Sequence, residues 1–278
     1  MSSTTKVALV TGASSGIGAD AALRLREAGY VVYGAARRVE RMTALRDAGV
    51  NILGLDVTDE DSIRKAIDQI ISESGRIDVL VNNAGYGSYG SLEDVPLSEA
   101  RAQIEVNVFG LAHLTQLVLP HMRRQHSGTI VNISSMGGKL VTPLGGWYHA
   151  SKYAVEALSD ALRMETKQFG IDVVVVEPGS IRTEWGAIAA ETLKETSGKG
   201  AYSTLAEGVA RTLAASSRPD ARMTSAPSVI GKTIVKIANA RRPRTRYRVG
   251  FGAAPTMFLR WLLPDRAFDF VVRGAFGV

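Results

Sequence analysis

Tyr148 and Lys152 are the residues whose types and spacing point most directly to chemistry, because they stand four positions apart in Tyr-His-Ala-Ser-Lys. On a helix, positions i and i+4 share a face, so a phenol and an ammonium can reach one small volume. A free tyrosine ionises near pH ~10 and exchanges protons poorly at neutral pH. A neighbouring cation favours the phenolate, lowers its pKa and suits it to proton exchange with a substrate oxygen. The spacing alone also fits a surface pair on an amphipathic helix, so other segments must decide.

A glycine-rich turn lies between the first apolar run, 7–11, and the helical pattern that starts at Ile17. Gly12, Gly16 and Gly18 give it the spacing G-x-x-x-G-x-G. Glycines let backbone N–H groups and a helix N-terminus approach a pyrophosphate closely. The place of the turn between a first strand and a first helix favours a dinucleotide site over a purely structural turn.

The end of the second predicted strand bears on which dinucleotide is bound. An acidic residue there would bind the adenosine ribose hydroxyls and repel a 2′-phosphate. The chain instead reads Gly-Ala-Ala-Arg-Arg over 34–38, and a guanidinium suits phosphate oxygens. We therefore predict NADP(H), with Arg37 as the main contact and Arg38 and Ser14 in support. The alternative is a pair of surface arginines at a helix entry.

Short β-rich runs alternate with longer helical patterns along the chain. We predict strands over 7–11, 30–35, 51–56, 79–82, 129–133 and 173–177, and helices over 17–28, 41–48, 60–72, 98–124 and 148–169. Nearly all-apolar runs are typical of parallel strands covered on both faces. The alternation predicts an α/β fold, a Rossmann-type doubly wound parallel sheet whose strand carboxyl ends form the ligand-binding rim.

No composition shift divides the chain, so we predict one dinucleotide-binding domain over 1–278. Its core spans 6–185, a helical rim insertion that would cover the substrate spans 182–228, and a C-terminal extension spans 229–278. The tail is strongly apolar with scattered arginines. We expect it to pack on the body or on a partner subunit, and a helix on a membrane surface is the alternative.

Composition is that of an ordinary soluble enzyme, with 278 residues of which 45% are hydrophobic and 22% charged. There is no cysteine, which excludes disulfides and thiolate metal ligands. The four histidines lack ligand spacing with carboxylates, so we predict no metal and treat them as ordinary surface or helix residues. His149 should point away from the face shared by Tyr148 and Lys152. Without a signal-like segment or ~20 uninterrupted apolar residues, we expect a cytoplasmic location and no membrane association.

The net charge of +6 is concentrated in arginines over 241–248. Residues 244–249 alternate at period two, which is typical of an edge strand with one solvated face. No recognised nucleic-acid motif accompanies them, so we expect no nucleic-acid partner.

Polar residues also follow the later strands, where a nicotinamide site on this scaffold needs them. Asp-Val over 56–57 ends the third predicted strand, Asn-Asn-Ala-Gly over 82–85 the fourth and Ser-Ser over 134–135 the fifth, while Asn107 lies in a long helical pattern. With the glycine turn, Tyr148-x-x-x-Lys152 and Pro-Gly over 178–179, this order closely resembles the short-chain dehydrogenase/reductase family over about residues 6–185. Segment 82–90 and the tail resemble its hydroxysteroid and retinol dehydrogenase-like branch.

The resemblance implies a catalytic set of Asn107, Ser135, Tyr148 and Lys152. Tyr148 would be the general acid/base, and Lys152 would hold the nicotinamide ribose and lower the pKa of Tyr148. Asn107 would position a water that joins Lys152 to solvent. The family places its serine thirteen positions before the tyrosine, which selects Ser135 over Ser134 as the residue that stabilises the reacting oxygen.

The resemblance also implies the contacts of the dinucleotide. The phosphates and adenosine ribose would meet Gly12, Ser14, Ser15, Ile17 and Gly18; the adenine would meet Asp56 and Val57; the central bridge would meet Asn83, Ala84 and Gly85; and the carboxamide end would meet Pro178, Gly179, Ile181 and Thr183. Arg37, Arg38, Tyr148 and Lys152 complete the predicted cofactor site.

We expect the substrate pocket between the loop after Ser135, the segment after Asn83 and the rim insertion. Its candidates are apolar or aromatic: Tyr86, Tyr89, Met136, Leu140, Val141, Leu144, Trp147 and Trp185. Such a lining favours a lipophilic ketone or alcohol over a phosphorylated sugar.

The predicted function is an NADP(H)-dependent oxidoreductase that interconverts a lipophilic ketone or aldehyde and its alcohol. An NADP(H)-binding sensor or scaffold without turnover and an acyl-carrier-linked 3-ketoacyl reductase are the alternatives. The family commonly pairs the helices around Asn107 and Tyr148 between subunits, so we also predict a homodimer or homotetramer.

Overall fold

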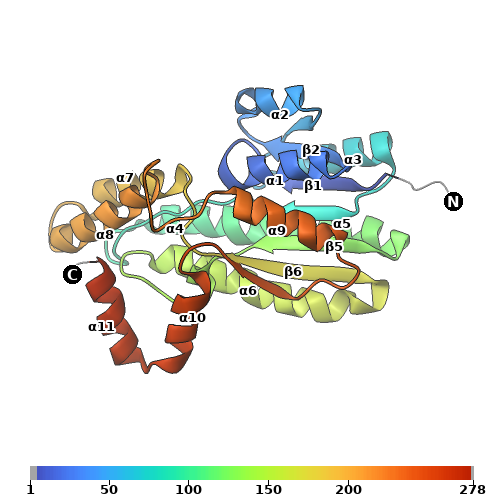
Figure 1. The fold of residues 1–278 in the computed structure, drawn as a ribbon. Coiled ribbons are helices and arrows are strands. Elements are labelled where there is room, and N and C mark those ends of the chain that lie inside the picture. Colours follow the sequence, from blue (N-terminus) through green and yellow to red (C-terminus); the bar gives the residue numbers. More distant parts are fainter. Residues whose placement is uncertain (1–4, 277–278) are drawn as a thin grey trace.

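A parallel sheet organises the computed structural model, which describes residues 5–276. In this part of the chain the sheet has seven strands in the order β3-β2-β1-β4-β5-β6-β7, and every neighbouring pair is parallel (Figure 1). The strands are β1 (Val7–Thr11), β2 (Val31–Ala36), β3 (Asn51–Gly54), β4 (Val79–Asn82), β5 (Gly128–Ile133), β6 (Ile171–Pro178) and β7 (Arg246–Val249). The strand order reverses between β1 and β4, so the predicted doubly wound Rossmann-type sheet is confirmed.

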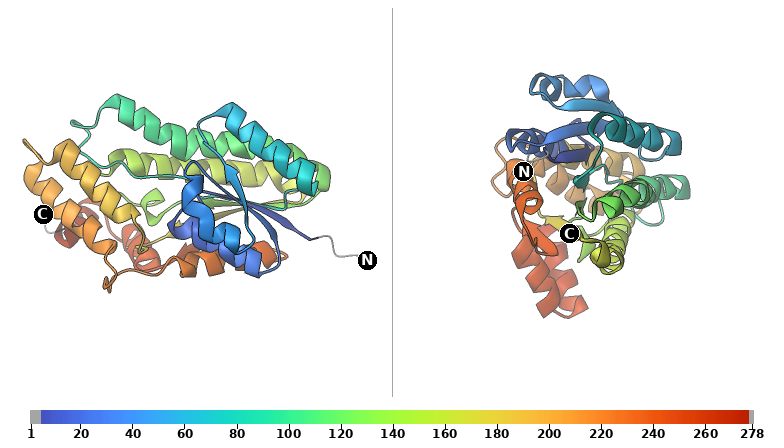
Figure 2. Two further views of the ribbon diagram at one scale, coloured as in Figure 1. Left: turned by 90° about the horizontal axis from the view of Figure 1, so that it is seen from above. Right: turned by 90° about the vertical axis from the view of Figure 1, so that its right-hand side faces the viewer.

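Helices cover both faces of the sheet (Figure 2). The α-helices of residues 5–276 are α1 (Gly16–Glu27), α2 (Thr43–Asp47), α3 (Glu60–Ser74), α4 (Leu97–Ile104), α5 (Leu111–Gln125), α6 (Gly146–Thr166), α7 (Trp185–Ser197), α8 (Ser203–Ser216), α9 (Ser228–Asn239), α10 (Ala253–Leu262) and α11 (Asp265–Phe276). One apolar cluster joins the sheet to α1, α2 and α9, and a second joins the other face to α3 and α5. The central strands are buried on both sides, which explains their uninterrupted apolar sequence.

Strand and helix boundaries differ from the prediction where side chains intervene. The third strand was predicted to reach Asp56 but ends at Gly54. Asp56 accepts hydrogen bonds from the backbone and the hydroxyl of Thr58, at 3.0 and 2.8 Å, and this local turn ends the extended chain.

The helix predicted over 98–124 is confirmed, but it contains a π-helical segment, η2 (Glu105–Gly110), between α4 and α5. Gly110 packs closely on the loop after β3, and a Cβ on Gly110 would lie 2.6 Å from the Val57 carbonyl oxygen. Asn107 lies within this segment and is buried. Such π-bulges are frequent at functional sites, and an apolar repeat read from sequence does not reveal one inserted residue.

The rim insertion forms the helical hairpin of α7 and α8, at the end of the sheet where the strands finish (Figure 1). Within the predicted C-terminal extension, α9 packs along α1 and β7 joins the edge of the sheet. Helices α10 and α11 then form a second hairpin. Met257, Phe268 and Val272 bury against Leu140, which confirms that the tail packs on the body.

Strand β7 is the edge strand that the alternating arginines predicted, but its arginine face is not simply solvated. Arg246 pairs with Glu156 at 3.0 Å and with Asp160 at 2.6 Å. Tyr247 and Val249 alternate onto the other face and pack in the core. The prediction of a solvated face holds for Arg248, which is 52% exposed, but not for Arg246, because α6 and β6 present carboxylates to it. Among residues 5–276, no helix is both long and apolar enough to cross a bilayer.

Candidate active site

The carboxyl ends of β1, β4, β5 and β6 bring the predicted segments to one rim. Gly12 and Gly16 have φ of +65° and +55°, a left-handed conformation that glycine adopts without steric cost. A Cβ on Gly18 would lie 2.3 Å from the Gly12 carbonyl oxygen. Ser15 precedes α1 without a side-chain cap, and the first turn of α1 carries no acidic residue. The N–H groups of the turn and helix therefore fit a pyrophosphate.

The Asn-Asn-Ala-Gly segment is fixed against the glycine turn by Thr11. The backbone N–H groups of Asn83 and Ala84 both donate to Thr11 Oγ1 at 3.0 Å, and Asn83 Nδ2 donates to the Thr11 carbonyl at 2.9 Å. A Cβ on Gly85 would lie 2.9 Å from Asn107 Oδ1 and 3.8 Å from Lys152 Nζ. Thr11 was not among the predicted site residues, although its position just before Gly12 could have signalled this role.

The segment after β6 also meets the glycine turn. Thr183 Cγ2 lies 3.1 Å from the position of a Cβ on Gly16. A Cβ on Gly179 would lie 2.1 Å from the Phe251 carbonyl oxygen, so only glycine fits there. Ile181 and Ile17 are both partly buried and pack against the same core cluster. The structure thus gathers both ends of the predicted dinucleotide contacts in one place.

Arg37 stands beside Asp56 at the carboxyl ends of β2 and β3. Its Nη1 lies 3.9 Å from Asp56 Oδ2, and its side chain is 73% exposed. The loose, exposed pair leaves the guanidinium free to meet another anion. Arg38 is likewise exposed, and Val57 is half-buried against Gly110.

Tyr148 and Lys152 are both buried on α6. Lys152 Nζ donates to the Ile133 carbonyl at 2.9 Å and lies 6.0 Å from the centroid of the Tyr148 ring. Ser135 accepts a hydrogen bond from the Gly137 N–H at 3.0 Å, and its hydroxyl is near enough to that of Tyr148 to lower the pKa of Tyr148. Three of the four predicted catalytic residues therefore lie within one small, desolvated region.

Burial dominates the proton affinities of this pair. It raises the pKa of Tyr148 to about 12, although the hydrogen bond with Ser135 lowers the pKa in part. It lowers the pKa of Lys152 to about 8, against the opposing negative charge of Glu156. Burial thus outweighs the neighbouring groups at Tyr148, and the ammonium of Lys152 is directed at the Ile133 carbonyl, so the predicted lowering of the pKa of Tyr148 by Lys152 stays a prediction.

Asn107 uses its whole carboxamide to hold the chain after Gly85. Its Nδ2 donates to the Tyr86 carbonyl at 2.9 Å and to Ser151 Oγ at 3.0 Å, while its Oδ1 accepts from the Tyr86 N–H at 3.0 Å. Ser151 in turn donates to the Tyr148 carbonyl at 2.7 Å. Asn107 thus fixes the Gly85–Tyr86 backbone against α6, and its predicted role in positioning a water stays a prediction.

Aromatic rings cover Tyr148. The ring centroid of Trp185 lies 5.1 Å from that of Tyr148, and both are 5.8 Å from the ring of Tyr89. Leu144 joins the same cluster with φ of +62°, a strained value for a residue with a side chain. Such strain is often found at ligand sites. These three neighbours of Tyr148 were predicted pocket residues.

The other predicted pocket residues lie elsewhere. Tyr86 turns its hydroxyl to Glu99 at 3.0 Å, whereas Met136 and Leu140 pack with the C-terminal hairpin. Val141 is 52% exposed, and Trp147 is half-buried outside the cluster around Tyr148. Residue type alone could not separate these side chains, because their directions depend on the loop that carries them.

His149 is a helix residue, as one of the predicted readings has it, but it is buried on α6 and anchors a loop. Its Nε2 accepts a hydrogen bond from the Thr142 N–H at 3.0 Å, so Nδ1 carries the proton and donates to the Gly137 carbonyl at 3.0 Å. Burial lowers the pKa of His149 and favours this neutral form. The ring of His149 thus joins Gly137 and Thr142, at the two ends of the loop after Ser135. Its position next to Tyr148 in the sequence could have indicated this role.

This arrangement defines the class of protein. A glycine turn at the reversal of a Rossmann-type sheet, beside a buried tyrosine that can exchange a proton, is the arrangement of a nicotinamide-dependent oxidoreductase. The chain belongs to the short-chain dehydrogenase family, whose model matches residues 6–194. In the part of the chain that the structure describes, no cluster of three or more metal-ligating residues occurs.

Similar proteins agree over nearly the whole chain. A 3-ketodihydrosphingosine reductase of Bacteroides thetaiotaomicron is 38% identical over 271 residues, which cover 96% of this chain and 97% of the relative. The solved structure of a short-chain dehydrogenase from Streptomyces avermitilis has a TM-score of 0.82 at 35% identity and covers 98% of this chain and 99% of its own.

Two further solved structures contain dinucleotides. A metagenomic short-chain oxidoreductase in complex with NADP has a TM-score of 0.69 at 28% identity and covers 89% of this chain and 98% of its own. A 3-ketoacyl-(acyl-carrier-protein) reductase from Brucella melitensis complexed with NADH has a TM-score of 0.72 at 25% identity and covers 88% and 96%. Similar folds thus contain either dinucleotide.

Proposed function

We propose that the protein interconverts a lipophilic ketone or aldehyde and the corresponding alcohol with NADP(H). The observation that carries this proposal is the buried pair of Tyr148 and Lys152, with the half-buried Ser135 near Tyr148, beneath the apolar and aromatic cluster of Tyr89, Leu144 and Trp185. An apolar lining with a few convergent polar groups suits a small lipophilic ligand.

The residues of this chain divide the binding of the dinucleotide between them. The N–H groups of the glycine turn and α1 would hold the pyrophosphate, Arg37 with Arg38 and Ser14 would hold the 2′-phosphate, and Lys152 would hold the nicotinamide ribose. The bound dinucleotide supplies or accepts the hydride. The exposed guanidinium of Arg37, with no acid at the end of β2, supports NADP(H) over NAD(H).

In the reductive direction, Tyr148 Oη gives its proton to the carbonyl oxygen as that oxygen gains negative charge. Ser135 Oγ donates a hydrogen bond to the same oxygen and stabilises the developing charge. A phenol with a pKa of about 12 keeps its proton at neutral pH and so enters the reaction in the acid form. The cover formed by Trp185 and Tyr89 excludes water from the reacting atoms.

The test follows NADPH absorbance with a panel of aldehydes, aliphatic ketones, steroids and 3-ketodihydrosphingosine, the substrate in the name of the Bacteroides relative. We expect turnover with a lipophilic carbonyl compound and a lower apparent dissociation constant for NADPH than for NADH. Tight NADPH binding without turnover across the panel would contradict the proposal and support the sensor alternative. Turnover only of carrier-bound substrate would support the 3-ketoacyl reductase.

Two further expectations accompany this function, a cytoplasmic location and a homodimer or homotetramer. The helices around Asn107 and Tyr148 expose Phe109, Tyr153 and Leu158, which supports their use as a subunit contact. Light scattering of the purified protein measures the assembly. A monomer at micromolar concentration would contradict the second expectation.

A further inference from the structure

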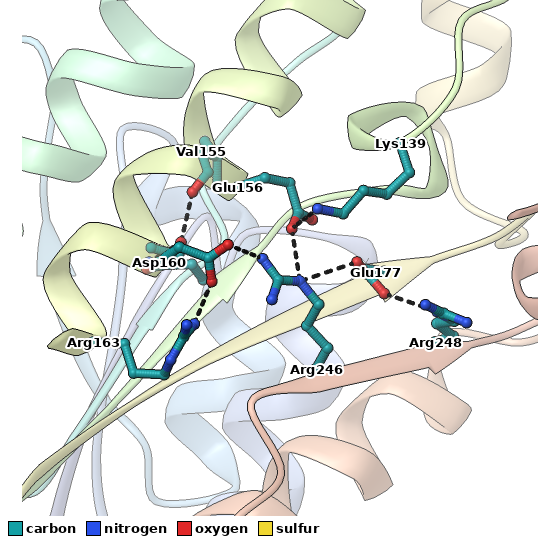
Figure 3. A network of polar contacts seen from close by, with 10 residues as sticks. Lys139, Val155, Glu156, Asp160, Arg163, Glu177, Arg246 and Arg248 are labelled. Atoms are coloured by element: carbon teal, nitrogen blue, oxygen red, sulfur yellow. Dashed lines mark hydrogen bonds and ion pairs between the residues drawn. The ribbon is translucent and has the colours of Figure 1, made fainter. Parts of the chain in front are cut away.

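A cluster of ion pairs lies directly behind the candidate site, where α6, β6, β7 and the loop after Ser135 meet (Figure 3). We call it the α6–β7 ion cluster; it consists of Lys139, Glu156, Asp160, Arg163, Glu177, Arg246 and Arg248. Glu156 is central to it, because its Oε2 lies 2.9 Å from Lys139 Nζ and 3.0 Å from Arg246 Nε. Arg246 also reaches Asp160 Oδ2 at 2.6 Å.

The two glutamates of this cluster are far more buried than its cations. The side chains of Glu156 and Glu177 are 4% and 0% exposed, whereas that of Arg248 is 52% exposed. Within residues 5–276, Glu156 Oε1 and both carboxylate oxygens of Glu177 make no hydrogen bond. Burying two carboxylates this incompletely satisfied is unfavourable, so stability alone does not explain the cluster.

Three residues of the cluster lie in the segments that carry the candidate site. Glu156 follows Lys152 by four residues on α6, and the two side chains therefore share a helix face. Lys139 lies in the loop that carries Ser135. Glu177 is the residue before Pro178, where the segment predicted to hold the carboxamide begins.

All charged groups around Glu156 can be assigned to an element. Lys152 and Asp160 lie on its own helix, Lys139 comes from the Ser135 loop, Arg246 and Arg248 come from β7, and Glu177 comes from β6. The negative charge of Glu156 stabilises the ammonium of Lys152 and opposes its desolvation. The positive charge of Lys139 offsets part of that effect, since it lies against the same carboxylate.

We propose that Glu156 is a positioning residue of the active site, which keeps Lys152 protonated and, through Lys139, holds the Ser135 loop against α6. The proposal rests on the proposed function in one respect, because Lys152 is taken to hold the ribose of the dinucleotide. It adds to the Asn107–Ser135–Tyr148–Lys152 set a residue that does not touch the reacting atoms.

Two substitutions with opposite electrostatic effects test the proposal. Glu156→Gln preserves shape but removes the negative charge, so Lys152 should lose its proton at lower pH. Lys139→Gln leaves Glu156 less neutralised, so Lys152 should keep its proton to higher pH. The readout is the dissociation constant for NADPH between pH 6 and 10, which should rise as Lys152 loses its charge. We expect the midpoint to fall by about 1 pH unit in Glu156→Gln and to rise by a smaller amount in Lys139→Gln.

Asp160→Asn is the matched control. It also removes a carboxylate partner of Arg246, but Asp160 lies two helical turns beyond Lys152 and is 37% exposed. Its midpoint should equal that of the wild type. Midpoints that move in the same direction in all three variants, or in none, would overturn the proposal and leave the cluster purely structural.

Lys139→Gln decides the question if Glu156→Gln fails to fold, because Lys139 is partly exposed and its loss is milder. A midpoint that does not rise in that variant would then overturn the proposal. The readout is binding and not turnover. A wild-type protein that binds NADPH with this pH dependence but reduces no carbonyl compound would therefore contradict the proposed function alone.

Discussion

The dinucleotide half and the substrate half of the site are built in different ways. In the dinucleotide half, backbone meets backbone: Gly18 lies against the Gly12 carbonyl, and Thr11 ties down the segment after β4. In the substrate half, side chains from α6, α7 and two loops meet as an aromatic cluster around Tyr148. The first half has little freedom to vary, whereas the second can change with each large side chain. The fold thus restricts the residues that meet the cofactor, whereas the residues that meet the substrate can vary.

Gly18→Ala should break the dinucleotide half and spare the substrate half. Its new Cβ would lie 2.3 Å from the Gly12 carbonyl oxygen, a backbone atom that cannot move aside cheaply. Overpacking of this kind costs about 1–3 kcal/mol, which corresponds to up to ~100-fold in the dissociation constant for NADPH. Fluorescence titration measures it. Gly54→Ala is the control, since its nearest neighbour would be at an ordinary 3.7 Å, and equal affinities in the two variants would contradict the contrast.

Lys152→Met removes the buried ammonium that lies at the boundary between the two halves. Burial lowers the pKa of Lys152 from 10.5 to about 8, so the charged form costs about 3 kcal/mol of stability below pH 8. Loss of the hydrogen bond to Ile133 offsets about 1 kcal/mol, and the variant should gain about 2 kcal/mol in urea unfolding at pH 7.

The pH dependence gives this prediction its sign. As pH rises from about 8 towards 10.5, the folded lysine loses its proton before the unfolded one, so the wild type should recover its deficit. The stability gap between wild type and Lys152→Met should therefore close over this range. A gap that stays constant with pH would contradict the burial of a charged lysine.

Arg37→Ala sharpens the dinucleotide half. If the exposed guanidinium binds the 2′-phosphate, its loss should weaken NADPH about tenfold and leave NADH unchanged. Arg41→Ala is the matched control, because Arg41 is also exposed but pairs with Glu184 at 3.2 Å. Equal losses for both dinucleotides would show that Arg37 does not choose between them.

Trp185→Phe should change the substrate preference alone, and its effect should be the smallest of these predictions. The indole packs on Tyr148 and over Gly87, so a smaller ring makes room beside the reacting tyrosine. We expect kcat/KM for a bulky ketone relative to a small one to rise by a few-fold, as about 1 kcal/mol of discrimination allows. NADPH affinity is the control and should not change. A larger effect on NADPH than on the ketones would remove the distinction between the halves.

The same contrast explains how far the sequence could predict the site. Gly12 and Gly18 were predicted because close backbone approach restricts the residue type there, and Asn83 and Thr183 were predicted from the family resemblance; the structure gathers all four. Leu144 and Trp185 also meet Tyr148, but Tyr86 and Met136 do not, since the loops that carry them set their directions. The π-helical turn at Asn107 escaped notice because it packs on distant chain at Val57, and the anchor at His149 because its partners include backbone groups of Gly137 and Thr142, which residue type does not mark.

The fold itself was largely predictable for a related reason. Nearly all-apolar runs such as that of β1 are typical of buried parallel strands, and the structure places β1 inside the sheet between β2 and β4. Strand β7 was recognised by its alternation. Its arginine face was misjudged because the facing carboxylates of Glu156 and Glu177 come from segments 90 and 71 residues earlier.

The central claim is that Tyr148 is the acid that protonates the substrate oxygen, and Tyr148→Phe tests it most directly. With a lipophilic ketone that the wild type reduces, NADPH oxidation is followed for both proteins at saturating NADPH. We predict a fall in kcat of about 100-fold or more, with a much smaller change in the NADPH dissociation constant, because the substitution removes the hydroxyl that gives the proton and keeps Lys152 and the glycine turn. Undiminished kcat in Tyr148→Phe would contradict the account.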